Sequence, residues 1–104
     1  MVIGDDVTWT VMFSGKAKRQ KERLPKKYQD ALNALRRDIE LNGPAAPNWP
    51  HYGKLKGKPD YHHCHLNKGT PRYVAVWKVT DKAIHLVEVR YVGTHEKADY
   101  RKIF

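Results

Sequence analysis

The sequence predicts a single α+β domain, with a helical hairpin packed on one side of a mostly antiparallel four-stranded sheet. Three observations point to this class: an alternating apolar stretch near the amino terminus, an amphipathic helical stretch in the middle, and three further strand-like stretches toward the carboxyl terminus. The length of 104 residues suits one domain, and no repeat or boundary divides residues 1–104. The expected order of elements is β-α-α-β-β-β-α.

The first expected strand and helix lie within residues 7–24. Apolar and polar side chains alternate along residues 7–13, with β-branched and aromatic residues among them, which is typical of a strand. Ser14 and Gly15 can end that strand and cap a helix. Residues 16–24 then form a short and very polar helix.

A second helix is expected from Pro25, which fits a first helical turn because it lacks a backbone N–H. Its apolar side chains recur every three or four residues and so form one stripe, at Tyr28, Leu32, Leu35 and Ile39. The sequence Asn-Gly-Pro at 42–44 indicates its end.

The second half of the chain is expected to be mostly strand. Residues 45–60 contain prolines at short intervals and predict a loop. Strands are expected at residues 61–66, 72–80 and 83–92, with Gly93 breaking the last of them. Residues 95–104 follow as a short helix or tail.

Composition favours a polyanion as partner. Lys and Arg number 20 against 11 Asp and Glu, so the net charge is +9. No run approaches the roughly 18 apolar residues of a membrane span, and acidic residues at 5 and 6 are unlike a signal peptide. Cys64 is the only cysteine, so we expect no internal disulfide and a cytoplasmic protein, with the thiol either buried or nucleophilic.

Two basic segments are candidate RNA contacts. One is the polar helix, with Lys16, Lys18 and Arg19, which is either an RNA-facing surface or a solvated helix face. The other contains Lys54, Lys56 and Lys58, which share one side if the backbone is extended. Contact with phosphates and simple solubility are both open interpretations of this second segment.

Histidines suggest acid–base chemistry on the sheet face opposite the helices. A period of two puts His63 and His65 on one face of their strand, and His62 and Cys64 on the other. Arg72, His95 and Tyr100 are expected to join the first two. Metal-independent cleavage of RNA needs a base for the 2′-hydroxyl, an acid for the leaving 5′-oxygen, and cations for the phosphate, and histidine and arginine supply these.

A zinc site competes with this interpretation, because residues 62–65 supply histidine and cysteine ligands. Neighbouring strand residues point to opposite faces, however, so at most two of them bind one ion, with His95 as a third ligand. We therefore expect no metal and no cofactor. His51 and His85 are interpreted as structural or solvated. Neither a glycine-rich nucleotide motif nor a serine nucleophile motif is present.

Four segments together resemble the RelE/ParE toxin superfamily of bacterial toxin–antitoxin systems, most closely its YafQ-like mRNA interferase branch. They are KLKG at 54–57, YHHCHL at 61–66, RYVAVWKVTD at 72–81 and VGTHEKADY at 92–100. The resemblance covers nearly the whole chain and implies a RelE-like fold for residues 1–104.

The resemblance implies an endoribonuclease toxin that cleaves mRNA, usually on the ribosome, by attack of the 2′-hydroxyl. It also implies a cognate antitoxin protein that covers the site, with operator DNA bound only through the antitoxin complex. No cofactor and no membrane are implied.

By the same resemblance, candidate catalytic residues are matched one by one. His65 stands where YafQ-like members have a histidine, and His95 is the histidine of their G-T-H motif. His63 with His65 replaces a lysine pair of RelE. Arg72 replaces an aspartate of YafQ, which removes a possible base and adds a phosphate clamp. Tyr100 matches the terminal aromatic residue, one position later than in YafQ. Lys54 and Lys56 match a basic K-L-basic-G segment.

Two other functions stay open at this point. A ParE-like toxin would inhibit DNA gyrase without catalysis, and a non-toxic nucleic-acid-binding module would need only the positive charge. The histidine-rich face favours the nuclease, because gyrase binding has no need of titratable groups there.

Overall fold

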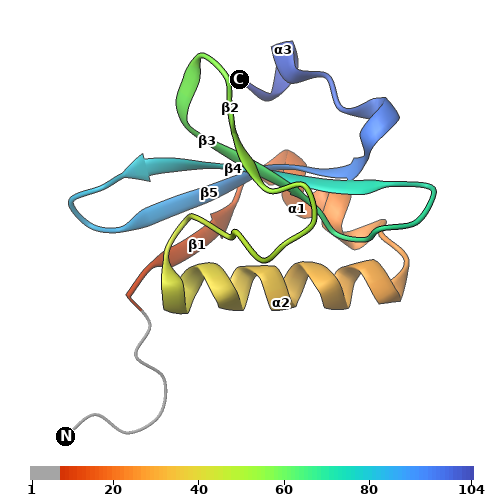
Figure 1. Cartoon of the computed structure of the whole chain (residues 1–104), viewed down its shortest axis with the longest axis horizontal. Coiled ribbons are helices and arrows are strands. Elements are labelled where there is room, and N and C mark those ends of the chain that lie inside the picture. Colours follow the sequence, from red (N-terminus) through yellow and green to blue (C-terminus); the bar gives the residue numbers. More distant parts are fainter. Residues whose placement is uncertain (1–7) are drawn as a thin grey trace, which may run out of the picture.

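The computed structural model describes residues 8–104, which form a five-stranded sheet between a helical layer and the carboxyl-terminal segment (Figure 1). The strands are β1 (Thr10–Phe13), β2 (Gly53–Leu55), β3 (Lys58–His65), β4 (Tyr73–Asp81) and β5 (Leu86–Thr94). The helices are α1 (Gly15–Glu22), α2 (Lys26–Asn42), the 3₁₀ helix η1 (His95–Lys97) and α3 (Tyr100–Ile103). The α+β class with a helical hairpin on one side of the sheet is confirmed.

The sheet has the order β1-β5-β4-β3-β2, with β1 parallel to β5 and every other pair antiparallel. The sheet has five strands, whereas four were predicted. The difference arises in residues 53–58, which were predicted to be a loop. They contribute β2 and the start of β3, and Gly53 pairs with His63 across this hairpin. Gly57 has φ 77°, a left-handed conformation that glycine adopts without strain, and this permits the tight turn.

Several strand boundaries differ from the predicted ones. Val7 of the first expected strand lies outside the described residues. Arg72 precedes β4 instead of beginning it. Residues 83–85 belong to the β4–β5 turn, where an Asp81 carboxylate oxygen accepts from the Ala83 N–H at 2.9 Å. Gly93 does not break β5 but pairs with Val74 inside the sheet.

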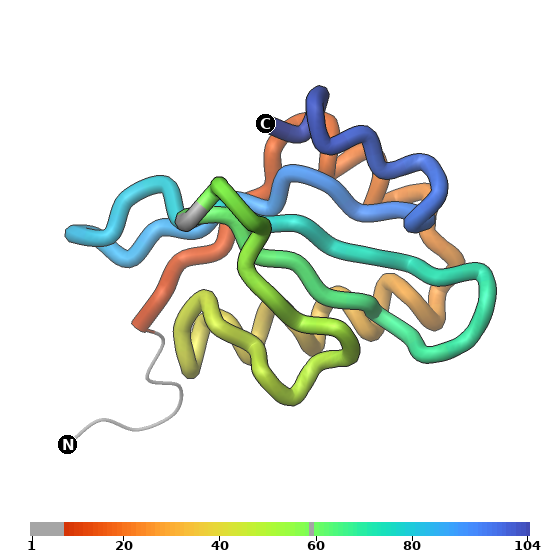
Figure 2. Tube along the Cα trace, turned by 45° about the horizontal axis from the view of Figure 1, so that its top comes forward, coloured from red at the N-terminus to blue at the C-terminus, as the bar shows by residue number. Residues whose placement is uncertain are grey.

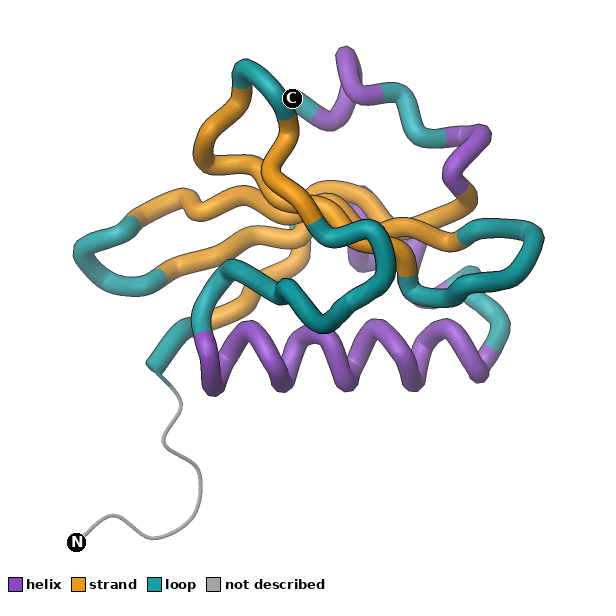
Figure 3. The backbone as a smooth tube through the Cα atoms, viewed as in Figure 1, coloured by secondary structure: helices purple, strands orange, loops and turns teal. Residues whose placement is uncertain are grey.

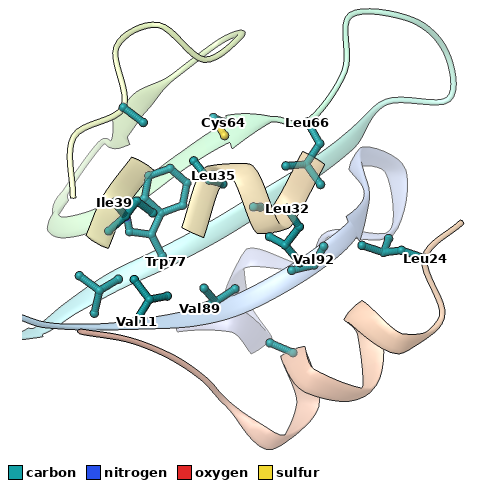
Figure 4. Close-up of a cluster of buried hydrophobic side chains, with 14 of the residues drawn as sticks. Val11, Leu24, Leu32, Leu35, Ile39, Cys64, Leu66, Trp77, Val89 and Val92 are labelled. Atoms are coloured by element: carbon teal, nitrogen blue, oxygen red, sulfur yellow. The ribbon is translucent and has the colours of Figure 1, made fainter. Parts of the chain in front are cut away.

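The helix-facing side of the sheet contains the main core (Figure 4). Ser14 caps α1 by accepting from the Ala17 N–H at 3.1 Å, as expected. Leu32, Leu35 and Ile39 of the predicted apolar stripe of α2 are buried and Tyr28 is half-buried, and the stripe faces a sheet side that includes Trp77 and Cys64. Burial raises the pKa of the Cys64 thiol to about 12, so this cysteine is an inert core residue.

The opposite side of the sheet is partly covered by the carboxyl-terminal segment (Figures 2 and 3). A second buried cluster forms there from four strand residues and one residue of α3: Tyr61, Val74, Val76, Tyr91 and Ile103. The alternation predicted for β3 and β4 is confirmed, since Val74 and Val76 lie on this face while Ala75 and Trp77 lie in the main core. Within residues 8–104 no helix is long and apolar enough to cross a membrane.

Candidate active site

Three imidazole rings pack together at one end of the sheet. His65 lies at the end of β3, His51 in the loop before β2, and His95 in η1 directly after β5. The ring centroids of His51 and His65 are 4.4 Å apart, and those of His65 and His95 are 5.8 Å apart. His65 is buried at 8% exposure, whereas His51 and His95 are exposed. We call these three residues the histidine cluster.

Backbone hydrogen bonds bring the three segments together. The His65 N–H donates to the Pro50 carbonyl at 2.7 Å, which holds the loop against the end of β3. The His95 N–H donates to the Arg72 carbonyl at 2.8 Å, which holds η1 against the start of β4. His51 has φ 53°, a left-handed conformation that is uncommon for a residue other than glycine, and His85 has the same φ.

The surroundings of the cluster disfavour protonation of its buried member. Burial lowers the pKa of His65 below its usual 6.5, and the nearby His51, His95, Arg72 and His63 lower it further. Burial, followed by His51 and His95, also lowers the pKa of His63. Both imidazoles are therefore neutral at physiological pH and are able to accept a proton.

His63 and Arg72, two further candidate residues from the sequence, lie beside the cluster. His63 faces the same side of β3 as His65, and its Nε2 is 3.5 Å from the place that a Cβ on Gly53 would take. The Arg72 side chain is exposed, and its charge lowers the pKa of His65.

Tyr100 is not in ring contact with a histidine anywhere in the described chain. It packs over the second buried cluster, with its ring centroid 6.1 Å from that of Phe104. Burial raises the pKa of its hydroxyl, which therefore stays protonated at neutral pH.

The lysines of the β2–β3 hairpin do not share one side, because the backbone turns at residues 56–57. Lys54 lines a cavity of about 430 Å³ together with the buried His62. Lys58 lies over the Phe104 ring, with its Nζ 4.9 Å from the ring centroid. The expected row of Lys54, Lys56 and Lys58 therefore assumed an extended backbone that the chain does not have.

The basic residues of α1 also lie in different surroundings, because one of them lines a cavity and the other two do not. Lys16 lines a second cavity, of about 460 Å³, with Arg23 of the same helical region and with Lys97 and Lys102 from the segment after β5. Asp99 also lines this cavity. Lys18 and Arg19 are exposed on α1 away from it. A strongly basic cavity therefore lies next to η1, which carries His95.

Sequence reasoning missed His51. It was interpreted as structural or solvated because it is a single histidine in a proline-rich loop, and its position beside His65 depends on the path of that loop. No group of three or more His, Cys, Asp or Glu side chains within residues 8–104 is arranged to hold a metal ion.

The fold is that of known toxins. No protein-family profile and no curated protein matches the chain. A mutant of the E. coli toxin RelE in the free state is 21% identical, with TM-score 0.69, over 88% of this chain and 87% of that one. The YoeB dimer of Staphylococcus aureus is 22% identical, with TM-score 0.66, over 85% and 98% of the two chains. The archaeal RelE–RelB complex of Pyrococcus horikoshii gives 16% identity and TM-score 0.66, over 88% and 99%.

Proposed function

We propose that this chain, which has the fold of the RelE and YoeB toxins, is an endoribonuclease toxin that cleaves mRNA and so inhibits translation. The observation that carries the proposal is the histidine cluster beside Arg72, at one end of the sheet of a strongly basic protein. A neutral imidazole that accepts a proton, a protonated imidazole that donates one and a permanent cation supply what phosphodiester cleavage by an internal nucleophile needs.

The proposed reaction begins at the RNA 2′-hydroxyl. Neutral His65 takes the hydroxyl proton, and the 2′-oxygen forms a bond to the adjacent phosphorus. The bond from phosphorus to the 5′-oxygen breaks, and His95 donates a proton to that leaving oxygen. The products are a 2′,3′-cyclic phosphate and a 5′-hydroxyl, and no metal takes part.

The other residues hold charge and orientation. The Arg72 guanidinium faces the phosphate as negative charge builds up on it. His51 and His63 lie beside His65, and a proton on either of them would disfavour a second proton on His65. Tyr100 orients the RNA from the edge of the carboxyl-terminal segment, where a base can stack on an aromatic ring.

The basic cavity beside η1 offers a path for the RNA backbone away from the cluster. Lys16, Lys97 and Lys102 come from two different segments and place their charges around one concave surface. We propose that phosphates next to the cleaved bond lie here, and that Lys58 contacts RNA at the other end of the carboxyl-terminal segment. Binding through such contacts weakens steeply as salt rises.

A protein antitoxin is the proposed partner. The S. aureus YoeB structures include a heterotetrameric complex with YefM, and the P. horikoshii RelE is bound to RelB. By analogy, a cognate antitoxin would bind this chain and cover the histidine cluster. An excess charge of +9 favours an acidic partner surface.

Induction of the gene in cells, followed by mapping of mRNA 5′ ends, tests the proposal. New ends phased with codons are expected for cleavage of ribosome-bound mRNA. Intact mRNA together with an SOS response would contradict it and would favour a gyrase inhibitor instead.

Purified protein gives the matched chemical test. Wild type incubated with RNA and EDTA should leave 2′,3′-cyclic phosphate ends, and His65→Gln should cleave about 10²–10⁴-fold more slowly. His85→Gln serves as the control, because His85 is an exposed histidine that stacks on Trp9 and lies at the opposite end of β5 from His95. Equal rates for His65→Gln and wild type would refute the role of His65.

A further inference from the structure

A tyrosine hydroxyl reaches across the end of β5. Tyr91 is buried at 6% exposure in the second cluster, with Val74, Val76 and Ile103. Its Oη donates to the Thr94 carbonyl oxygen at 2.8 Å. The Tyr91 side chain therefore extends along β5 from residue 91 to Thr94, the residue that precedes His95.

Gly93 leaves the space that this hydroxyl occupies. A Cβ built on Gly93 would come within 2.7 Å of the Tyr91 Oη and 3.0 Å of its Cζ, closer than real Cβ contacts. Position 93 therefore requires glycine, because a Cβ there would overlap with the Tyr91 hydroxyl. Any side chain at position 93 would push the Tyr91 hydroxyl away from Thr94.

The hydrogen bond from Tyr91 holds the peptide group between Thr94 and His95. That group consists of the Thr94 carbonyl and the His95 N–H. Its oxygen accepts from Tyr91 Oη at 2.8 Å, and its N–H donates to the Arg72 carbonyl at 2.8 Å. Because the C=O and N–H of a trans peptide point in opposite directions, the two bonds fix the peptide plane from both sides.

We propose that Tyr91 is a positioning residue for His95, which acts by holding the Thr94–His95 peptide through its hydroxyl, with Gly93 as the space that this contact requires. The inference rests on the proposed nuclease function, in which His95 donates the proton to the leaving oxygen. Burial raises the pKa of Tyr91, so its hydroxyl stays protonated and able to donate at the pH of the reaction. A catalytic group displaced by about 1 Å can lose about 10²-fold in rate.

The test compares two buried tyrosines. Tyr91→Phe keeps the ring and removes only the hydroxyl. Tyr61→Phe is the matched control, because Tyr61 is also 6% exposed in the same cluster and its hydroxyl makes no side-chain hydrogen bond within the described part of the chain. Tyr91→Phe should lower kcat about tenfold with KM within about twofold of wild type, whereas Tyr61→Phe should leave both unchanged.

Amide hydrogen exchange supplies a readout that does not depend on cleavage. The His95 amide should exchange several-fold faster in Tyr91→Phe than in wild type, while amides in α2 keep their wild-type rates. Gly93→Ala should reproduce both effects, because the added methyl displaces the hydroxyl.

Wild-type kcat and wild-type His95 exchange in Tyr91→Phe would overturn the proposal, and so would equal rate losses in both tyrosine variants. If the wild type itself cleaves no RNA, the proposed nuclease function fails, and the catalytic part of this inference fails with it. Exchange at His95 then still decides whether Tyr91 holds this peptide.

Discussion

Protonation of His62 should lower the stability of the protein in acid, and replacement of this side chain should remove the part of the loss that is due to His62. His62 is 4% exposed, and its ring packs against the rings of Tyr52 and Trp77, at centroid distances of 5.9 and 5.8 Å, while those two rings are 6.3 Å from each other. Its Nδ1 is hydrogen-bonded to the Tyr52 hydroxyl at 2.8 Å. Burial, and then the charge of Lys54, lower its pKa from 6.5 to about 4.

The sign and size of the effect follow from this pKa. The unfolded chain binds a proton at His62 below pH 6.5, whereas the folded chain does so only near pH 4, so stability is lost as pH falls through this window. At pH 7 His62 is neutral in the folded chain and mostly neutral in the unfolded chain, so almost none of this stability has been lost. Between pH 7 and pH 5, His62 therefore removes about 2 kcal/mol of unfolding free energy.

Urea unfolding of wild type and His62→Phe at pH 7 and pH 5 measures this contribution. Phenylalanine keeps a ring in the stack, and its effects on packing appear at both pH values and cancel in the difference. The fall in unfolding free energy between the two pH values should be about 2 kcal/mol smaller in the variant. The same fall in both proteins would refute the reasoning that His62 is held neutral by its surroundings.

Three further predictions concern the candidate site and the core. Arg72→Ala should slow RNA cleavage about 10²–10³-fold, measured with a labelled RNA, and a rate within about threefold of wild type would remove Arg72 from the mechanism. Because the pKa of His65 is lowered, the acid limb of the pH–rate profile, where the base becomes protonated, should have its midpoint below 6.5, and a midpoint above 6.5 would contradict a neutral base. Cys64 should react with a thiol reagent only as fast as the protein unfolds, and rapid labelling of the native protein would contradict its burial.

Local sequence patterns predicted the faces of the sheet correctly. Period two placed His63 and His65 opposite Cys64, and the structure has Cys64 in the main core and the two histidines on the other face. These predictions succeeded because side-chain direction in a strand depends only on the strand itself.

Sequence reasoning failed where the outcome depends on contacts between distant segments. The proline-rich segment before residue 61 gave no sign of β2, a three-residue strand that exists because it pairs with β3. His51 joins His65 because the Pro50 carbonyl accepts from the His65 N–H, and no pattern in the loop predicts that bond. The packing of Tyr100 against the second buried cluster, whose α3 member is Ile103, likewise depends on contacts that no local pattern predicts.

The crowding of histidines argues for proton transfer at this site rather than for simple binding of a polyanion. Burial and the neighbouring His51, His95 and Arg72 all penalise a proton on His65. A surface that only bound phosphates would gain from the opposite arrangement, because charged side chains attract phosphates more strongly than neutral ones do. The chain places exposed lysines in the neighbouring cavity, at Lys16 and Lys97, and keeps the buried imidazole of His65 neutral beside the exposed His51 and His95. That division of charged and neutral groups is what a general base next to a cationic RNA path requires.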